Sequence, residues 1–175
     1  LELPDGTPLG EHEALLLRLT WPDAEPRPLR QDQGRVDPQL AEGRVLFAWA
    51  GAVPHEAHAQ ALREACTQGA RDWTTLPDVT LRSLKAALHE GPPVSVLHLL
   101  VHGEPKGLRF AGRVVSPKRL AARLRPYADR LRLVVLCACE SAKAGGLGSA
   151  LGSAAEALHR AGVEAVLAAR DPLSK

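Results

Sequence analysis

Two segments place a reactive side chain where an apolar run ends. The run "VSVLHLLV" is followed by His102 and Gly103, and the run "LRLVVLCA" is followed by Cys139 and Glu140. In an open parallel sheet, ligands and substrates bind beyond the carboxyl ends of the strands, where such positions meet. An imidazole beside a thiol is a nucleophile with its proton carrier. The two segments therefore predict a Cys–His pair, provided that their strands are neighbours.

Strands and helices alternate around these segments. Continuous apolar runs predict buried strands over residues 44–50, 94–101, 130–138 and 163–169. Helical spacing and end signals predict helices over residues 54–70, 81–91, 117–128 and 148–162. The segment 107–116 alternates and contains a glycine, which predicts a small hairpin. Apolar strands separated by helices indicate an α/β fold, a mostly parallel sheet with helices on both faces.

Specific residues mark the helix ends and faces. Thr80 and Ser116 are typical N-cap residues, and Pro117 suits a first helical position. In the first helix, four apolar residues follow helical spacing: Ala57, Ala61, Leu62 and Ala65. The caps predict where two of the helices begin, and the apolar spacing supports the first helix.

The composition excludes several classes of protein. The 175-residue chain has the size of one domain, and with 3% aromatic residues its core must be aliphatic. The net charge is +2 and the basic residues are scattered along the sequence, so we expect no nucleic-acid partner. The apolar runs are shorter than the about 20 residues that a membrane span needs. Three cysteines are no disulfide framework, which favours a cytoplasmic protein.

The first 43 residues differ from the rest. The segment "WPDAEPRPLRQDQGRVDP" is rich in proline and charge and predicts a loop or linker, while "EALLLRLTW" before it has the pattern of a strand. We therefore expect an N-terminal appendage and linker over residues 1–43 and a catalytic domain over residues 44–175.

Three stretches, in this order, resemble the CHAT family of caspase-like cysteine proteases. They are "VLHLLVHGE", "GLRFAGRVVSPKRLAARL" and "LVVLCACESAKAGG". In that family an apolar strand ends in His-Gly, and a later strand ends in a small-Ala-Cys-Glu-small segment. The sequence departs from the family at Cys137, where relatives usually have Ser. The resemblance implies a caspase-like three-layer sandwich and a cysteine endopeptidase that needs no cofactor.

The resemblance also implies a role for each residue at the strand ends. Cys139 is the nucleophile, and His102 polarises the thiol or protonates the leaving amine. The backbone N–H groups of Gly103 and Cys139 form the oxyanion hole, in which one donor is worth about 3–4 kcal/mol. Cys137 lies two residues before Cys139 and so on the same side of the strand. We expect it to be a packing or pocket-lining residue, not a second nucleophile.

The P1 pocket is expected to be uncharged. In several caspase-like families the residue two before the nucleophile lines this pocket, and an Asp there selects basic P1 residues. Cys137 is small and neutral. The segment "GAVPHEAH" offers three further candidates for substrate binding, namely His55, Glu56 and His58. The alternative is that these three side chains have no role in substrate binding and only lie in the first turn of a helix, where the charge of Glu interacts favourably with the helix dipole.

The resemblance and the chain ends together suggest partners. Relatives often act in bacterial defence by cleaving a protein such as a gasdermin. The chain begins at Leu1 without Met and ends at Lys175, which predicts a large subunit cut out by a trypsin-like protease. A small subunit from the same precursor would pair with the strand at 163–169, because proteins normally cover such edges. The alternative is that these ends have nothing to do with processing.

Zinc binding is the first alternative to proteolysis. His98, His102, Cys137 and Cys139 are suitable ligand types. However, His98 and His102 would lie about 13 Å apart on one strand, too far to share a metal unless the strand is broken. We therefore expect no metal. His98 is expected to be a buried histidine with satisfied hydrogen bonds.

Two further alternatives remain. The glycine-rich segment at 145–152 lies between a strand and a helix, as in a nucleotide-binding α/β domain. Its spacing is G-x-G-x-x-x-G, and its first glycine comes six residues after Cys139, which does not fit the dinucleotide fingerprint. The other alternative is a catalytically inactive caspase-like scaffold. Nothing in the sequence favours it, since both candidate catalytic residues are present.

Overall fold

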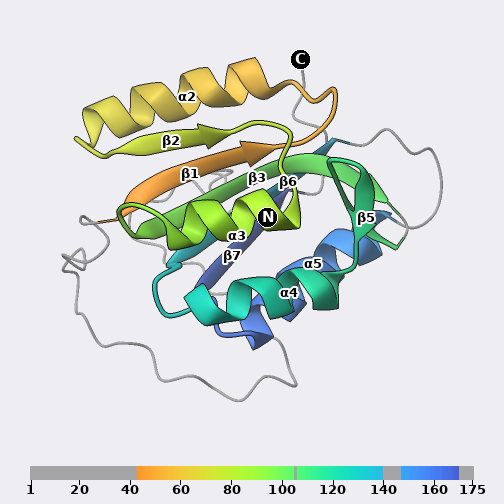
Figure 1. Ribbon diagram of the computed structural model, residues 1–175. Coiled ribbons are helices and arrows are strands. Elements are labelled where there is room, and N and C mark those ends of the chain that lie inside the picture. The colour runs from red at the N-terminus through yellow and green to blue at the C-terminus, as the bar shows by residue number, and fades with distance from the viewer. Residues whose placement is uncertain (1–42, 105, 140–146, 170–175) are drawn as a thin grey trace, which may run out of the picture. The chain divides into compact units, whose positions relative to one another are not determined.

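The computed structural model describes residues 43–104, 106–139 and 147–169 (Figure 1). Residues 1–42 of the expected appendage over 1–43, including the strand expected in "EALLLRLTW", lie outside the described residues. Within the described ranges, no helix is long and apolar enough to cross a membrane.

A parallel sheet in the order β2-β1-β3-β6-β7 forms the centre of the fold (Figure 1). Its strands are β1 (Arg44–Trp49), β2 (Trp73–Leu76), β3 (Val94–Glu104), β6 (Leu133–Cys139) and β7 (Ala165–Ala169). The four strands expected from apolar runs are confirmed. The sequence does not predict β2, because "WTTL" is short and half polar.

A β-hairpin pairs with the C-terminal end of β3, where this strand extends past its parallel neighbours. It consists of β4 (Gly107–Phe110) and β5 (Arg113–Val115), which pair in antiparallel fashion as the sequence predicts. β4 also pairs with the end of β3. Because β4 supplies hydrogen-bond partners there, β3 continues to Glu104. His102 and Gly103 therefore lie within the strand, and not beyond its end as the expected bounds 94–101 placed them.

Helices cover both faces of the sheet. α2 (His55–Gln68) lies on one face (Figure 1). The other face carries α3 (Leu81–His89), α4 (Pro117–Leu124), the short 3-10 helix η2 (Arg125–Tyr127) and α5 (Leu147–Arg160). The predicted α/β fold with a mostly parallel sheet between two helical layers is confirmed.

Alternate residues of the strands build two separate apolar clusters. Leu46 and Ala48 of β1 point to the larger cluster beneath α3, α4 and α5. Phe47, between them, points to a smaller cluster under α2, together with Leu100 and Cys137. This period of two follows from the pleat. It divides the molecule into a thick aliphatic layer and a thinner layer that also contains histidines.

α2 packs through other residues than the alanines of its sequence pattern. Cys66 is buried, and Ala59 and Leu62 are partly buried against the sheet. The alanines at 57, 61 and 65 are exposed. The helix is rotated so that Leu62 and Cys66 contact the sheet, because they remove more apolar surface from water than alanine does.

The predicted caps of α3 and α4 are confirmed. The Thr80 hydroxyl accepts the backbone N–H of Ser83 at 3.0 Å, and the Ser83 hydroxyl accepts the N–H of Thr80 at 3.0 Å. Ser116 accepts the N–H of Arg119 at 3.4 Å, and Pro117 is the first residue of α4. These caps satisfy backbone N–H groups that have no partner inside the helix.

In the described part of the chain, β7 pairs with β6 alone. Leu167 of β7 is 57% exposed there. The expectation that a small subunit pairs with this strand stays a prediction.

Candidate active site

The two residues of the predicted Cys–His pair are register partners on neighbouring strands. His102 of β3 lies opposite Cys139 of β6 in a parallel ladder. Neighbouring strands are about 4.8 Å apart. Cys139 is the last residue of β6, and His102 lies close to the end of β3. The condition that the two strands be neighbours is therefore met. The Cys139 side chain and residues 140–146 lie outside the described part of the chain.

The ring of His102 lies against the backbone that leaves β1. Gly51 has φ +79, and a Cβ built on it would lie 3.1 Å from Cδ2 and 3.3 Å from Nε2 of His102. On the ring's other nitrogen, the buried Nδ1 has no hydrogen-bond partner within the described residues. Buried polar atoms nearly always have a partner. An unpartnered ring nitrogen at this edge is one that a neighbouring thiol could use as a hydrogen-bond partner.

The β3–β4 hairpin holds the backbone beside His102. Gly103 is buried and pairs with Leu108 of β4. One residue further, Glu104 accepts from the Arg109 guanidinium of β4 at 2.7 Å. The predicted oxyanion-hole residue Gly103 therefore sits in a fixed ladder and not in a loose turn.

The predicted substrate-binding residues lie in different surroundings. The His55 ring stacks on Trp49 with the ring centres 4.7 Å apart, and its Nδ1 lies 3.1 Å from the carbonyl oxygen of Val53. Glu56 is exposed in the first turn of α2. Cys137 is 6% exposed within the apolar cluster under α2. A packing role suits Cys137, and its contribution to a P1 pocket stays a prediction.

A second group of reactive side chains meets under α2. Nδ1 of His58 lies 3.2 Å from Nε2 of His98. These nitrogens and the Cys137 sulfur all lie within 4.8 Å of one another. Burial, reinforced by the neighbouring His58, lowers the pKa of His98 to about 4. Burial also lowers the pKa of His58. Both imidazoles are therefore neutral at pH 7.

This cluster differs from the set of four ligands that the sequence suggests. β3 is unbroken between His98 and His102, so these two histidines do not converge. Instead, α2 contributes His58. The expectation that His98 has a hydrogen-bond partner is confirmed, and that partner is His58. The expectation that its ring is buried is wrong, because His98 is only half-buried.

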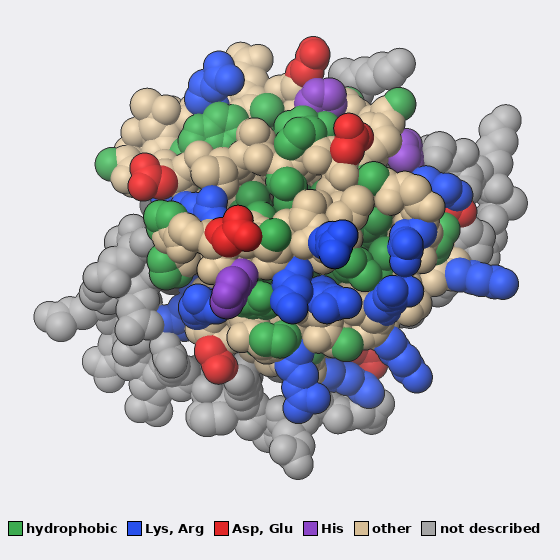
Figure 2. Space-filling model, viewed as in Figure 1, with side chains coloured by type: hydrophobic (Ala, Val, Ile, Leu, Met, Phe, Trp, Pro, Cys, Tyr) green, Lys and Arg blue, Asp and Glu red, His purple; other side chains and the backbone are tan. Residues whose placement is uncertain are grey.

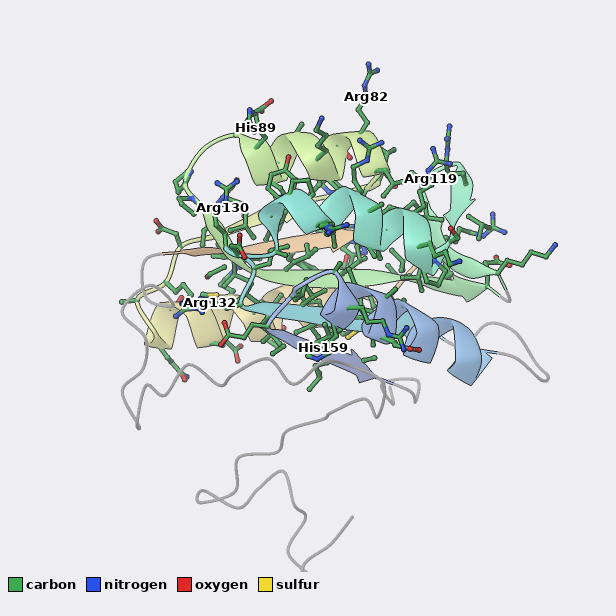
Figure 3. The ribbon with its side chains drawn as sticks, turned by 90° about the horizontal axis from the view of Figure 1, so that it is seen from below. Arg82, His89, Arg119, Arg130, Arg132 and His159 are labelled. Carbon is green, nitrogen blue, oxygen red and sulfur yellow. The ribbon has the colours of Figure 1, made fainter. Side chains whose placement is uncertain are left out.

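The other face of the sheet carries a cationic cavity of about 510 Å³. It is lined by Thr80, Leu81, Arg82, Lys85, Ala111, Arg113, Arg119 and Arg123. Lys and Arg side chains gather over α3 and α4 in Figure 2, and Figure 3 shows Arg82 on α3 and Arg119 on α4. The fold thus gathers basic residues that are scattered in the sequence. α2 and the histidine cluster lie on the opposite face.

The glycine-rich segment is not an open loop throughout. α5 begins at Leu147, so Gly148 and Gly152 lie inside a helix. Gly145 lies outside the described residues. A phosphate-binding loop needs its glycines before the helix, where backbone N–H groups approach the phosphate. The helical placement removes support for a nucleotide site here.

Comparison with known proteins identifies the family. A family model described as the CHAT domain matches residues 6–175. The chain belongs to the CHAT family. CHAT domains are generally cysteine protease-like, in keeping with the strand ends described above. Neither the curated proteins nor the solved structures contain a match to this CHAT chain.

The sequence of the CHAT chain points to His102 and Cys139 but misses two groupings. One is the cluster of His58 with His98, and the other is the cationic cavity. Each joins residues from separate elements, so no local pattern reveals it. The single available signal is the spacing of three between His55 and His58, which places both on one face of a helix.

Proposed function

We propose that this CHAT chain is a cysteine endopeptidase with Cys139 as nucleophile and His102 as its proton carrier. The observation that carries the proposal is the parallel register of the two residues at the carboxyl edge of the sheet. The buried Nδ1 of His102, without a hydrogen-bond partner in the described residues, supports it. A catalytic base needs such a free nitrogen within reach of the proton that it takes.

The reaction is an acyl transfer in two steps. His102 takes the thiol proton of Cys139, and the thiolate attacks the carbonyl carbon of the peptide bond. The C–N bond breaks, the amine leaves with the proton from His102, and an acyl-enzyme remains. Water then gives up a proton to His102 and cleaves the thioester, which releases the carboxylic acid and restores the thiol. Backbone N–H groups of Gly103 and Cys139 stabilise the oxyanion in both steps.

The substrate is proposed to be a protein with an uncharged residue at P1. Cys137, small and neutral two residues before the nucleophile, supports this specificity. A role in bacterial defence, with a gasdermin as substrate, rests on the family resemblance alone. A peptide-library cleavage profile tests the specificity, and one dominated by Arg or Lys would contradict it and point to Glu56.

The central experiment compares two thiol deletions in the full chain. Cys139→Ala should reduce kcat/KM for the best library peptide at least about 10³-fold, because nucleophile and base act as a unit. His102→Ala should cost nearly as much. Cys66→Ala removes a buried thiol from α2 and should retain activity. If Cys139→Ala and the parent were equally inert on all peptides, the chain would be a binding scaffold and the proposal would be wrong.

A further inference from the structure

We propose that His58, His98 and Cys137 form a zinc-binding site under α2, separate from the His102–Cys139 pair. The acyl-transfer steps use none of these three side chains, although Cys137 is also the residue proposed to line the P1 pocket. They come from three different elements, α2, β3 and β6, that the fold brings together. Three potential ligands from separate elements converge here on one point.

The separations suit a single zinc ion. Tetrahedral zinc with nitrogen and sulfur ligands at about 2.0–2.3 Å keeps its ligand atoms about 3.4–3.6 Å apart. Nδ1 of His58 and Nε2 of His98 are already 3.2 Å apart. With all three ligand atoms within 4.8 Å of one another, the thiol needs only a small movement to complete the set.

The chemistry of the donors also suits zinc. Two imidazoles and one thiolate form a donor set that selects zinc over magnesium or calcium. Neutral imidazole is the form that binds a metal. On binding, zinc takes the place of the proton that the two rings share. That proton moves to another ring nitrogen. The Cys137 thiol releases its proton to solvent as the Zn–S bond forms.

Apolar groups pack against one side of the cluster, whose two histidines are half-buried. The Phe47 ring meets His98 edge-on at 5.2 Å between centres and lies nearly parallel to His58 at 6.3 Å. Leu100 and Cys137 belong to the same buried cluster. Such a shell limits access of water to a metal. A hydrogen-bonded histidine pair would explain the two rings, but it would not require a thiol beside them.

The site is distinct from the catalytic pair but shares its strands. His102 lies four residues beyond His98 on an unbroken strand, about 13 Å away, so one ion cannot bind both. Cys139 lies two residues beyond Cys137, about 7 Å along β6. A bound zinc ion would therefore tie together α2 and the two strands that carry the catalytic pair.

Cobalt binding tests the proposal directly. Full-length protein is stripped with a chelator and titrated with Co²⁺, which replaces zinc and is coloured. We expect one equivalent of tetrahedral Co²⁺ with a thiolate-to-metal charge-transfer band, displaced by Zn²⁺. Zinc at about 100 times its Kd should raise the Tm by roughly 5–10 °C, because it binds the folded state.

Four variants assign the ligands. Cys137→Ser and His58→Gln should each weaken zinc binding more than about 10–100-fold, since even outer-shell changes cost that much. Cys139→Ala and Cys66→Ala should bind like the parent. Should Cys137→Ser fail to fold, His58→Gln, at a half-exposed position of α2, still decides the question. Cobalt binding that is lost in Cys139→Ala but kept in Cys137→Ser would overturn the proposal, as would a folded parent that binds no cobalt. Neither readout uses proteolysis, so failure here is separate from failure of the proposed protease activity.

Discussion

At the scale of single residues, the position of His102 depends on the space that Gly51 leaves beside its ring. A Cβ at Gly51 would lie 3.1–3.3 Å from its ring, and its buried Nδ1 has no hydrogen-bond partner within the described residues. A carboxylate that orients the imidazole is therefore absent from the described surroundings. The lack of a side chain at Gly51 leaves room for the ring, so this glycine helps to set the position of His102.

Gly51→Ala tests this positioning role. The new methyl group would meet the His102 ring at 3.1–3.3 Å, and φ +79 disfavours any side chain. We expect kcat/KM to fall about 10-fold or more by displacement of the ring, together with a loss of roughly 1 kcal/mol of folding stability. Peptide cleavage and thermal unfolding of the same preparations measure the two effects.

Gly112→Ala is the matched control. Gly112 has φ +78, but a Cβ there meets nothing within 4 Å. It should show a similar stability loss with nearly unchanged kcat/KM. Equal activity losses in the two variants would show that backbone strain, and not contact with His102, causes the effect.

The element scale shows what the sequence can and cannot predict. Apolar runs and caps are local, so the four apolar strands and the starts of α3 and α4 are predicted well, whereas the half-polar β2 is not. The rotation of α2 is not local, because it depends on which of its residues removes most surface against the sheet. For the same reason, the spacing of the alanines does not reveal that His58 contacts His98. The extension of β3 to Glu104 depends on pairing with β4, which lies later in the chain.

The layer between α2 and the sheet should make stability depend on pH. In metal-free protein, the folded pKa of His98 is about 4, below the ordinary 6.5 of an unfolded chain. Unfolded protein therefore binds more protons between these values. His98 contributes stability that is fully present above pH 6.5 and lost as pH falls to about 4. The loss amounts to about 3 kcal/mol, at 1.36 kcal/mol per pH unit. His58 from α2 acts in the same direction, and Cys137 from β6 faces both rings.

Denaturant unfolding from pH 7 to pH 4 measures this dependence. The free energy of unfolding of the parent should fall more steeply than that of His98→Gln, which has no imidazole to protonate. The difference between the two curves isolates His98 from other titrating groups. Parallel curves for parent and variant would show that burial of this ring does not control acid stability.

At the scale of the whole molecule, the two helical layers differ in charge. Although the net charge is only +2, Lys and Arg side chains gather around the cavity over α3 and α4 (Figure 2). The histidine cluster and the candidate active site belong to the side of α2. A local field of this kind acts on anions within about one Debye length, which is about 10 Å at 0.1 M salt. Polyanions should therefore be attracted to one face of the molecule.

A pair of charge reversals with the same net effect tests this asymmetry. Arg119→Glu changes the cationic cavity, and Arg63→Glu makes the same change of −2 on α2, where Arg63 lies 5.9 Å over the Trp73 ring. On a sulfated polyanion resin, Arg119→Glu should elute at clearly lower salt than the parent, while Arg63→Glu should elute close to it. Attraction to a cluster of charges depends on where the charges lie, whereas attraction to the net charge does not. Identical shifts of the elution salt in both variants would therefore mean that net charge alone controls retention.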